Sequence, residues 1–275
     1  MTDHVFARSD WSHEPQRSSP ATSQPRAPTG RTQTVGVFRH VRGAIYDWST
    51  LSERIAAIAS RGRDDRISFY RHGETKYNER KLVSGQHDTM LSPRGRDAAK
   101  SLQKALPRPL DLIVCSELTR AIETMRLSVP SQVQASRPVW RDRRLNEVHL
   151  GVLQGKKAVF IQQFADGELS WAPAGGESYR DAAQRVFSSV VDVFDELERM
   201  GHPPKGAAVF CHAGVMRIIG TLIDPDSKSG NVFKGSAKNL ECLVVLATRL
   251  SLPGFWWEGN IGRDREDNRR QNRRG

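Results

Sequence analysis

The sequence predicts a three-layer α/β domain, with a largely parallel central sheet and helices on both of its faces. Two observations support this fold class. Short apolar runs typical of buried strands alternate with longer segments in which apolar residues recur at helical spacing. Each of the first three runs is followed by a helical segment, as expected when consecutive strands lie parallel in one sheet. No internal repeat is visible, so a repeat architecture is not indicated.

The predicted elements follow from local patterns. Strands are expected over residues 67–70, 112–115 and 207–211, with 240–247 as a further candidate. Ser92 followed by Pro93 predicts an N-cap and a first-turn proline for a helix that continues through Leu106. Ser178 with Asp181 predicts the start of a long helix. Its apolar residues at helical spacing are Ala182, Val186, Val190, Val193, Phe194 and Leu197.

The segments that flank this domain differ from it in composition. Residues 1–34 are rich in Ser, Thr, Pro, Gln and Arg, and we expect a disordered polar tail because they bury too little apolar surface to offset the entropy of ordering. Residues 35–65 form a predicted N-terminal extension, in which Thr50 and Glu53 indicate a capping box that opens a short helix. The main domain spans 66–262, and 263–275 is a basic tail, either solvated or an arm for nucleic acid.

Composition narrows the class of protein. The net charge of +11 favours anionic partners. The three cysteines, Cys115, Cys211 and Cys242, are far apart and form no CxxC pair, which predicts reduced thiols in buried strands rather than a disulfide or a zinc site. No apolar run is long enough to span a membrane, and the N-terminus lacks the pattern of a secretory signal. We therefore expect a soluble, cytoplasmic protein.

Polar residues stand directly after the predicted strands. Arg71 and His72 follow the first strand, Ser116 and then Arg120 follow the second, and His212 follows the third. In an open α/β sheet the carboxyl ends of the strands border the crevice where ligands bind, so these segments should converge. Two histidines and two arginines would then meet at one edge of the sheet.

These residues belong to a longer ordered set of motifs. The set consists of Arg71-His72-Gly73-Glu74-Thr75 followed by Asn78, Gly85, Asp88, Leu91, Ser92 and Gly95; Ser116-x-x-x-Arg120-Ala-x-x-Thr124; Leu145-x-Glu147-x-x-x-Gly151-x-x-x-Gly155; Gly175-Gly-Glu-Ser178 before a long helix; and a strand that ends at His212. It resembles the signature of the histidine phosphatase (phosphoglycerate mutase-like) superfamily over roughly residues 66–250. The predicted main domain, 66–262, would then be the catalytic domain of a histidine phosphatase.

The resemblance implies a role for each matched position. His72 would be the nucleophile that forms a phosphohistidine, and His212 a second imidazole at the phosphate. Glu147 would be the proton donor, although Glu74 lies near the nucleophile and an exchange of roles stays open. The residues that the resemblance implies for binding the substrate phosphate are Arg71, Arg120, His212, Asn78 and Ser84. The implied reaction is hydrolysis of phosphate monoesters without a metal or other cofactor.

Physical chemistry supports these roles. Planar guanidinium groups match the equatorial oxygens of a phosphoryl group with paired hydrogen bonds. The positive charge of two arginines disfavours imidazolium and should keep His72 neutral and nucleophilic. A covalent intermediate divides the reaction into two easier displacements.

Some positions depart from the family pattern. Many relatives have His-Gly-Gly where this chain has His212-Ala213-Gly214, and Trp-Glu-Gly where it has Leu153-Gln154-Gly155. Between Glu147 and Gly175 the chain is short and carries only Lys156 and Lys157 as cations, whereas mutases have a longer, more basic insertion here. A short segment should let water reach the phosphohistidine, which favours hydrolysis.

Two alternatives stay open from the sequence. One is a phosphoglycerate mutase, and the other is a non-catalytic relative that binds phosphate or uses its tails to bind nucleic acid. We expect a small phosphorylated substrate and neither nucleic acid nor a membrane as partner; the oligomeric state is open. Phe160, Phe164 and Trp171 would line an apolar pocket beside the phosphate or pack in the core.

Overall fold

The computed structural model describes residues 38–157, 167–224, 226, 228, 232 and 238–256. The predicted tails, 1–34 and 263–275, and the side chains of Phe160 and Phe164 lie outside the described residues. Within the described part, no helix is both long and apolar enough to cross a membrane.

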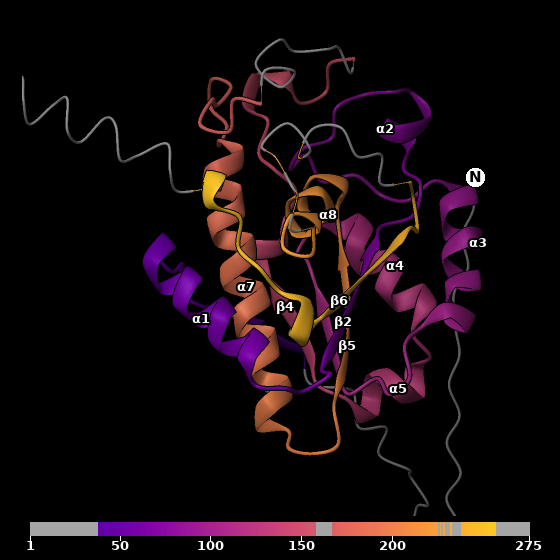
Figure 1. Cartoon of the computed structure of the whole chain (residues 1–275). Coiled ribbons are helices and arrows are strands. Elements are labelled where there is room, and N and C mark those ends of the chain that lie inside the picture. Colours follow the sequence, from indigo (N-terminus) through magenta and orange to yellow (C-terminus); the bar gives the residue numbers. More distant parts are fainter. Residues whose placement is uncertain are drawn as a thin grey trace, which may run out of the picture. The chain divides into compact units, whose positions relative to one another are not determined.

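Six strands form one mixed sheet at the centre of the fold (Figure 1). They are β1 (Phe38–Val41), β2 (Arg66–Arg71), β3 (Leu112–Cys115), β4 (Val139–Asp142), β5 (Gly206–Cys211) and β6 (Cys242–Leu246). Their order across the sheet is β1-β4-β3-β5-β2-β6. Strand β6 pairs antiparallel with β2, and the other neighbouring pairs are parallel. The predicted α/β class with a largely parallel sheet is therefore confirmed.

Helices cover both faces of this sheet (Figure 1). The α-helices are α1 (Trp48–Ser60), α2 (Lys76–Glu79), α3 (Pro93–Ser101), α4 (Thr119–Ser128), α5 (Ser131–Ser136), α7 (Tyr179–Arg199) and α8 (Ala213–Gly220). Because side chains alternate along a strand, β3 contributes Leu112 and Val114 to a core shared with α1, α7 and α8. It contributes Ile113 and Cys115 to a second core shared with α4 and α5. Burial on both faces explains the continuous apolar runs in the sequence.

The segment before β2 is part of this layered structure. Strand β1 pairs in parallel with β4 and forms one edge of the sheet, and α1 packs along α7. The Trp48 ring of α1 lies 6.3 Å from the Phe187 ring of α7 and 6.1 Å from that of Trp256, measured between ring centroids. The sequence patterns indicated neither β1 nor β4 as a strand.

Some local predictions are correct and others are wrong. Ser92 and Ser178 are N-caps as predicted, and Ser178 forms a capping box with Asp181. The capping box proposed at Thr50 is wrong: α1 begins earlier, because the Asp47 carboxylate accepts a hydrogen bond from the Thr50 N–H over 2.8 Å. The helix predicted through Leu106 is α-helical only to Ser101 and continues as a 3₁₀-helix, Leu102–Ala105.

The cysteine prediction holds for two of the three residues. Cys115 and Cys211 are free thiols buried in β3 and β5. Cys242 is also free but exposed, contrary to the expectation, because β6 lies at the edge of the sheet.

Candidate active site

The register of two neighbouring strands brings the predicted histidines together. Arg71 at the end of β2 pairs with Cys211 at the end of β5, so His72 and His212 leave the sheet side by side. The His72 N–H donates to the Cys211 carbonyl over 3.0 Å. The two imidazole rings are 5.2 Å apart between centroids, and both are buried. The predicted convergence at the carboxyl edge therefore occurs.

Hydrogen bonds fix the orientation of the His72 ring. Its Nδ1 lies 2.7 Å from the Gly73 carbonyl oxygen, which can only accept, so Nδ1 carries the proton and Nε2 keeps its lone pair. The next peptide is held as well, since the Gly73 N–H donates to Thr124 Oγ1 over 2.9 Å. The unprotonated Nε2 of His72 accepts a hydrogen bond from Arg120 Nε over 3.2 Å. This tautomer leaves on Nε2 the lone pair that a nucleophile needs.

Burial and positive charge keep both imidazoles neutral. Burial is the largest cause that holds the pKa of His72 well below its ordinary value, and Arg120 and Arg71 add to it. The pKa of His212 is also held well below its ordinary value, first by burial and then by Arg120, His72 and Arg71. The sequence argument named the arginines as the cause; the structure shows that burial comes first.

Arg120 is fully buried at the start of α4. Two backbone carbonyl groups of the loop between α2 and α3 hold its guanidinium. Arg120 Nη1 donates to the His87 carbonyl over 2.9 Å, and Nη2 donates to the Gly85 carbonyl over 2.6 Å. Burial lowers the pKa of Arg120 to about 10, so it stays charged at neutral pH. Gly85 has a φ of +48°, and a Cβ atom there would lie 2.1 Å from Gln154 Oε1. A glycine at this position lets the loop adopt a positive φ and pack against the Gln154 side chain.

His212 is held by a polar network behind the strand ends. Its Nε2 lies 2.7 Å from Ser116 Oγ, which is 3.0 Å from Asn146 Oδ1. The same Asn146 oxygen accepts a hydrogen bond from the Glu117 N–H over 3.0 Å. Among the residues that the structure describes, the buried Nδ1 of His212 has no hydrogen-bond partner.

The carboxylate of Glu147 lies at the start of α8. Its Oε1 accepts from the Val148 N–H over 2.9 Å and its Oε2 from the Gly214 N–H over 3.2 Å. Gly214 leaves the necessary room, because a Cβ atom there would lie 2.3 Å from Glu147 Oε1. Glu74 takes a different position: its Oε2 accepts from Ser92 Oγ over 3.3 Å, and its side chain is not among the pocket-lining residues described next.

A pocket of about 260 Å³ joins these groups. Six of the seven predicted site residues line it: Arg71, His72, Asn78, Ser84, Arg120 and Glu147. The exception is His212, which lies beside His72. Asn78 Oδ1 accepts from the Thr75 N–H over 3.1 Å, so this amide also caps α2. Ser84 Oγ is buried and has no partner within the described residues.

The motif analysis missed several residues that build the site. Arg217 and Tyr179 line the pocket, and Arg217 Nη2 donates to the Tyr179 hydroxyl over 3.0 Å. Arg185 holds the backbone beneath the pocket, because its Nη2 donates to the Glu147 carbonyl over 3.2 Å and pairs with Glu177. A signal for Arg217 was present: it is the only charged residue in the otherwise apolar segment 213–220.

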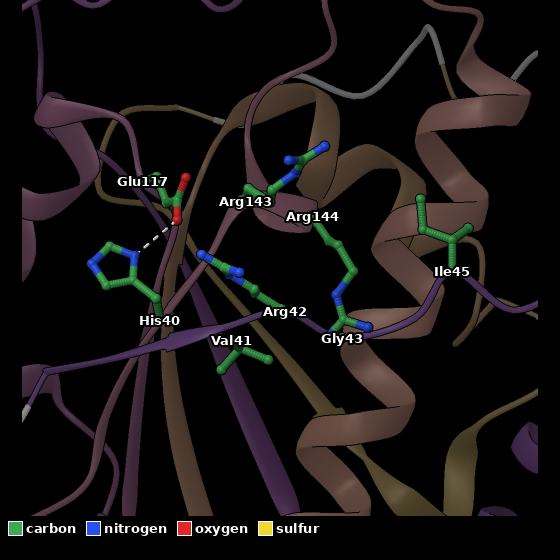
Figure 2. A pocket seen from close by; sticks show the side chains of 8 residues that line it. All are labelled: His40, Val41, Arg42, Gly43, Ile45, Glu117, Arg143 and Arg144. Carbon is green, nitrogen blue, oxygen red and sulfur yellow. Dashed lines mark hydrogen bonds and ion pairs between the residues drawn. The ribbon is translucent and has the colours of Figure 1, made fainter.

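Figure 2 shows a second pocket, of about 540 Å³, that the predicted site residues do not line. It lies at the ends of β1 and β4. His40 Nδ1 lies at hydrogen-bond distance, 3.1 Å, from Glu117 Oε1 at one side, and Arg144 extends toward Gly43 at the other (Figure 2). A Cβ atom at Gly43 would lie 2.3 Å from the Arg144 guanidinium carbon. Arg144 is neutralised by ion pairs of 2.8 Å with Asp142 and 2.9 Å with Asp192.

Metal ligands do not gather in the described part of the chain. The structure describes no group of three or more His, Cys, Asp or Glu side chains there with the arrangement of a metal site. The positive groups at the pocket are guanidinium groups, which bind phosphate oxygens directly.

Two curated relatives resemble part of this chain in sequence. A glucosyl-3-phosphoglycerate phosphatase of Mycolicibacterium vanbaalenii is 40% identical over 145 residues, which are 50% of this chain and 63% of that enzyme. The enzyme of the same name from Mycobacterium tuberculosis is 33% identical over 173 residues, 58% of this chain and 76% of that protein. This chain therefore spans less than two thirds of the first relative and about three quarters of the second.

A solved structure and a family model extend the comparison. The native structure of mycobacterial glucosyl-3-phosphoglycerate phosphatase superposes with a TM-score of 0.57 and 30% identity, over 66% of this chain and 90% of that one. The model of the histidine phosphatase superfamily, branch 1, matches residues 67–245. This range contains the ends of β2 and β5, both histidines and every described residue that lines the pocket of about 260 Å³. The chain therefore belongs to the histidine phosphatase superfamily, as its motifs predicted.

Proposed function

We propose that this chain hydrolyses phosphate monoesters through a phosphohistidine formed on His72. One observation carries the proposal. The buried, neutral His72 presents the lone pair of Nε2 beside Arg120, in a pocket that Arg71 and Glu147 also line. A neutral imidazole is nucleophilic, and arginine stabilises the charge of a phosphoryl group in transfer.

The first half of the reaction forms the intermediate. His72 Nε2 attacks phosphorus, and the bond from phosphorus to the ester oxygen breaks. The departing oxygen takes a proton from Glu147, since an alkoxide is a poor leaving group. A bound phosphate dianion favours the protonated form of a nearby carboxyl group, which prepares Glu147 for this role. Arg71 and Arg120 bind the phosphoryl oxygens.

The second half releases phosphate. Water attacks phosphorus and gives a proton to the Glu147 carboxylate, and the bond from phosphorus to His72 Nε2 breaks. Two further groups would donate hydrogen bonds to phosphate oxygens during both steps. They are the unpartnered Oγ of Ser84 and the amide of Asn78 at the pocket wall. Neutral His212 donates from Nε2 to Ser116, whose hydroxyl donates to Asn146, so its Nδ1 would bind a phosphate oxygen only after taking up a proton.

Hydrolysis is favoured over a mutase reaction by the short segment after Glu147. A mutase must retain a bisphosphorylated intermediate and exclude water. Between Glu147 and Gly175 the chain carries only two lysines, Lys156 and Lys157, and neither is among the residues found to line the pocket. The phosphatase names of the relatives support the same choice.

We expect small phosphorylated molecules as substrates, and neither nucleic acid nor a membrane as partner. The relatives are named for glucosyl-3-phosphoglycerate, and we propose that this chain also acts on a phosphorylated small acid or its glycoside. We expect the protein to work in the cytoplasm, where the exposed Cys242 would remain reduced.

The test is phosphate release from an aryl phosphate in excess chelator. We expect chelator-resistant activity in the wild type and in His202→Ala, which alters an exposed histidine, and loss of activity in His72→Ala. Quenching the wild type with labelled substrate should trap an acid-labile phosphoprotein that the His72 variant cannot form. Activity that requires a metal, or that survives the loss of His72, contradicts the mechanism.

A further inference from the structure

The pocket of Figure 2, which we call the edge pocket, is built from two different parts of the chain. Residues 40–45, at and just after the end of β1, form one part of its lining. The other part follows β3 and β4, and consists of Glu117, Arg143 and Arg144. The family model begins at residue 67, so residues 40–45 lie outside it. The N-terminal extension therefore completes a cavity that residues 67–245 alone do not line.

The edge pocket lies at a place in the sheet that favours ligand binding. Strands β1, β4 and β3 are parallel neighbours, so their carboxyl ends lie at the same edge. After β3 the chain enters α4, which packs in the second core, whereas the segments after β1 and β4 lead to α1 and to α7, which pack in the first. Where the connections leave toward opposite faces of a parallel sheet, a crevice opens at the carboxyl ends, and ligands bind there.

Two arginines give the edge pocket positive charge. Arg144 is already neutralised by its two ion pairs. Arg42 and Arg143 are exposed, and within the described part of the chain they form no ion pair. Among the described lining residues Glu117 is the one carboxylate, and its charge offsets one guanidinium at most. The pocket therefore attracts an anion.

The volume and the apolar lining indicate a ligand larger than inorganic phosphate. The edge pocket has about 540 Å³, against about 260 Å³ for the pocket beside His72, which we call the phosphate pocket. Ile45 lines the edge pocket and is 59% exposed. Figure 2 shows Ile45 at the end of the pocket opposite to Glu117. An apolar group laid against Ile45 would remove its surface from water, which is favourable.

We propose that the edge pocket binds a phosphorylated small molecule with an apolar part, at a site separate from the phosphate pocket. The phosphate would accept hydrogen bonds from Arg42 and Arg143, because planar guanidinium groups match its oxygens. The apolar part of the ligand would cover Ile45. The two pockets share no described lining residue, so this site does not depend on the reaction at His72.

Equilibrium dialysis of the full chain with the dianion of butylphosphonate tests this site. The carbon–phosphorus bond of a phosphonate is not an ester, so the probe stays intact. We expect the wild type to bind one more butylphosphonate per chain than the variant Arg42→Met/Arg143→Met. Either substitution alone should weaken binding at this site about tenfold, the lower end of what a hydrogen bond to a charged group contributes, because the groups are exposed. Affinity should also fall as salt is added.

A second probe and a matched variant serve as controls. Methylphosphonate has the same anion without the longer alkyl chain, and we expect it to bind the edge pocket about tenfold more weakly. Ile45→Ser should remove most of this difference, because the apolar surface is lost. Arg94→Met/Arg249→Met removes two other exposed guanidinium groups and lowers the net charge equally. This variant should bind as many butylphosphonate molecules as the wild type.

Three results would overturn the proposal. The first is an equal number of bound butylphosphonate molecules in the wild type and in Arg42→Met/Arg143→Met. The second is the same loss in the control variant, which would assign the binding to net charge. The third is equal affinity of the edge pocket for both phosphonates. If circular dichroism shows that the double variant does not fold, each single variant must show the tenfold loss. The phosphate pocket is unchanged in every variant, so the comparison is independent of whether His72 acts in hydrolysis.

Discussion

The contact between Gly214 and Glu147 allows the proton donor to be displaced without being removed. A Cβ atom at position 214 would lie 2.3 Å from Glu147 Oε1, and ordinary contacts begin at 3.4 Å, so in Gly214→Ala the carboxylate must retreat by about 1.1 Å. A misplacement of about 1 Å in a reacting group can cost about 100-fold in rate. We therefore expect kcat on an alkyl phosphate to fall about 100-fold.

Two further measurements distinguish a displaced proton donor from a general loss of structure: the activity on a substrate with a better leaving group, and the stability of the variant. An aryl phosphate with an acidic phenol needs less help from a proton donor, so its kcat should fall less than that of the alkyl phosphate. Alanine is favoured over glycine inside a helix by about 1 kcal/mol, so the free energy of unfolding should not fall in proportion to activity. The assay is steady-state phosphate release on both substrates, paired with urea unfolding.

The same helix offers a matched control. A Cβ atom at Gly220, the last residue of α8, meets no heavy atom within 4 Å. Gly220→Ala should therefore keep full activity on both substrates. If Gly214→Ala keeps full kcat on the alkyl phosphate, or loses equally on both substrates, the reasoning that places Glu147 as a positioned proton donor is refuted.

Three further predictions concern stability. Since burial and nearby arginines hold the pKa of His72 and His212 well below the ordinary value, the unfolded chain takes up protons that the folded one does not. The free energy of unfolding should therefore be highest above about pH 6.5 and should fall as the pH drops below that value. Urea unfolding at several pH values measures this dependence. It should be shallower in a variant in which both histidines are replaced by alanine. Ser178→Ala removes the N-cap of α7 and should lower the free energy of unfolding by about 1 kcal/mol, and an unchanged urea midpoint would contradict this. Ser116→Ala leaves His212 Nε2 and the Asn146 amide without their shared partner and should cost about 1–3 kcal/mol in the same assay, whereas a cost near zero would show that the network is dispensable.

The sequence predicted the site better than it predicted the edges of the fold. Strands β3 and β5 are continuous apolar runs, and β2 has Ile67, Phe69 and Tyr70 at its centre, because both faces of the sheet are covered; such runs can be recognised without a structure. The polar residues that follow them converge because parallel strands end at one edge. Strands β1 and β4 contain the charged residues Arg39, Arg141 and Asp142, and their pairing depends on contacts between distant segments.

Whether a side chain completes the pocket depends on the direction in which it points, and a sequence motif does not give that direction. Arg217 and Arg185 lie on helices whose apolar periodicity is visible, but the sequence does not show which way one charged side chain turns. Arg185 turns toward the Glu147 carbonyl and Arg217 toward Tyr179, and both contacts join segments far apart in the chain. The start of α1 was misplaced for a simpler reason: Asp47 and Thr50 are both good N-cap residues, and only the geometry chooses between them.

The position of β1 has a consequence for the order of folding. Phe38 pairs with Val139, and α1 rests on α7, which ends at Arg199. During synthesis β1 and α1 precede the other described elements, yet β4 emerges only when about half of the chain has been made, and α7 only when nearly three quarters has been made. Contacts of such long sequence separation slow folding, and an unpaired strand invites association with other chains in the meantime. Of the elements that the structure describes, β1 is therefore made first and is among the last that can dock.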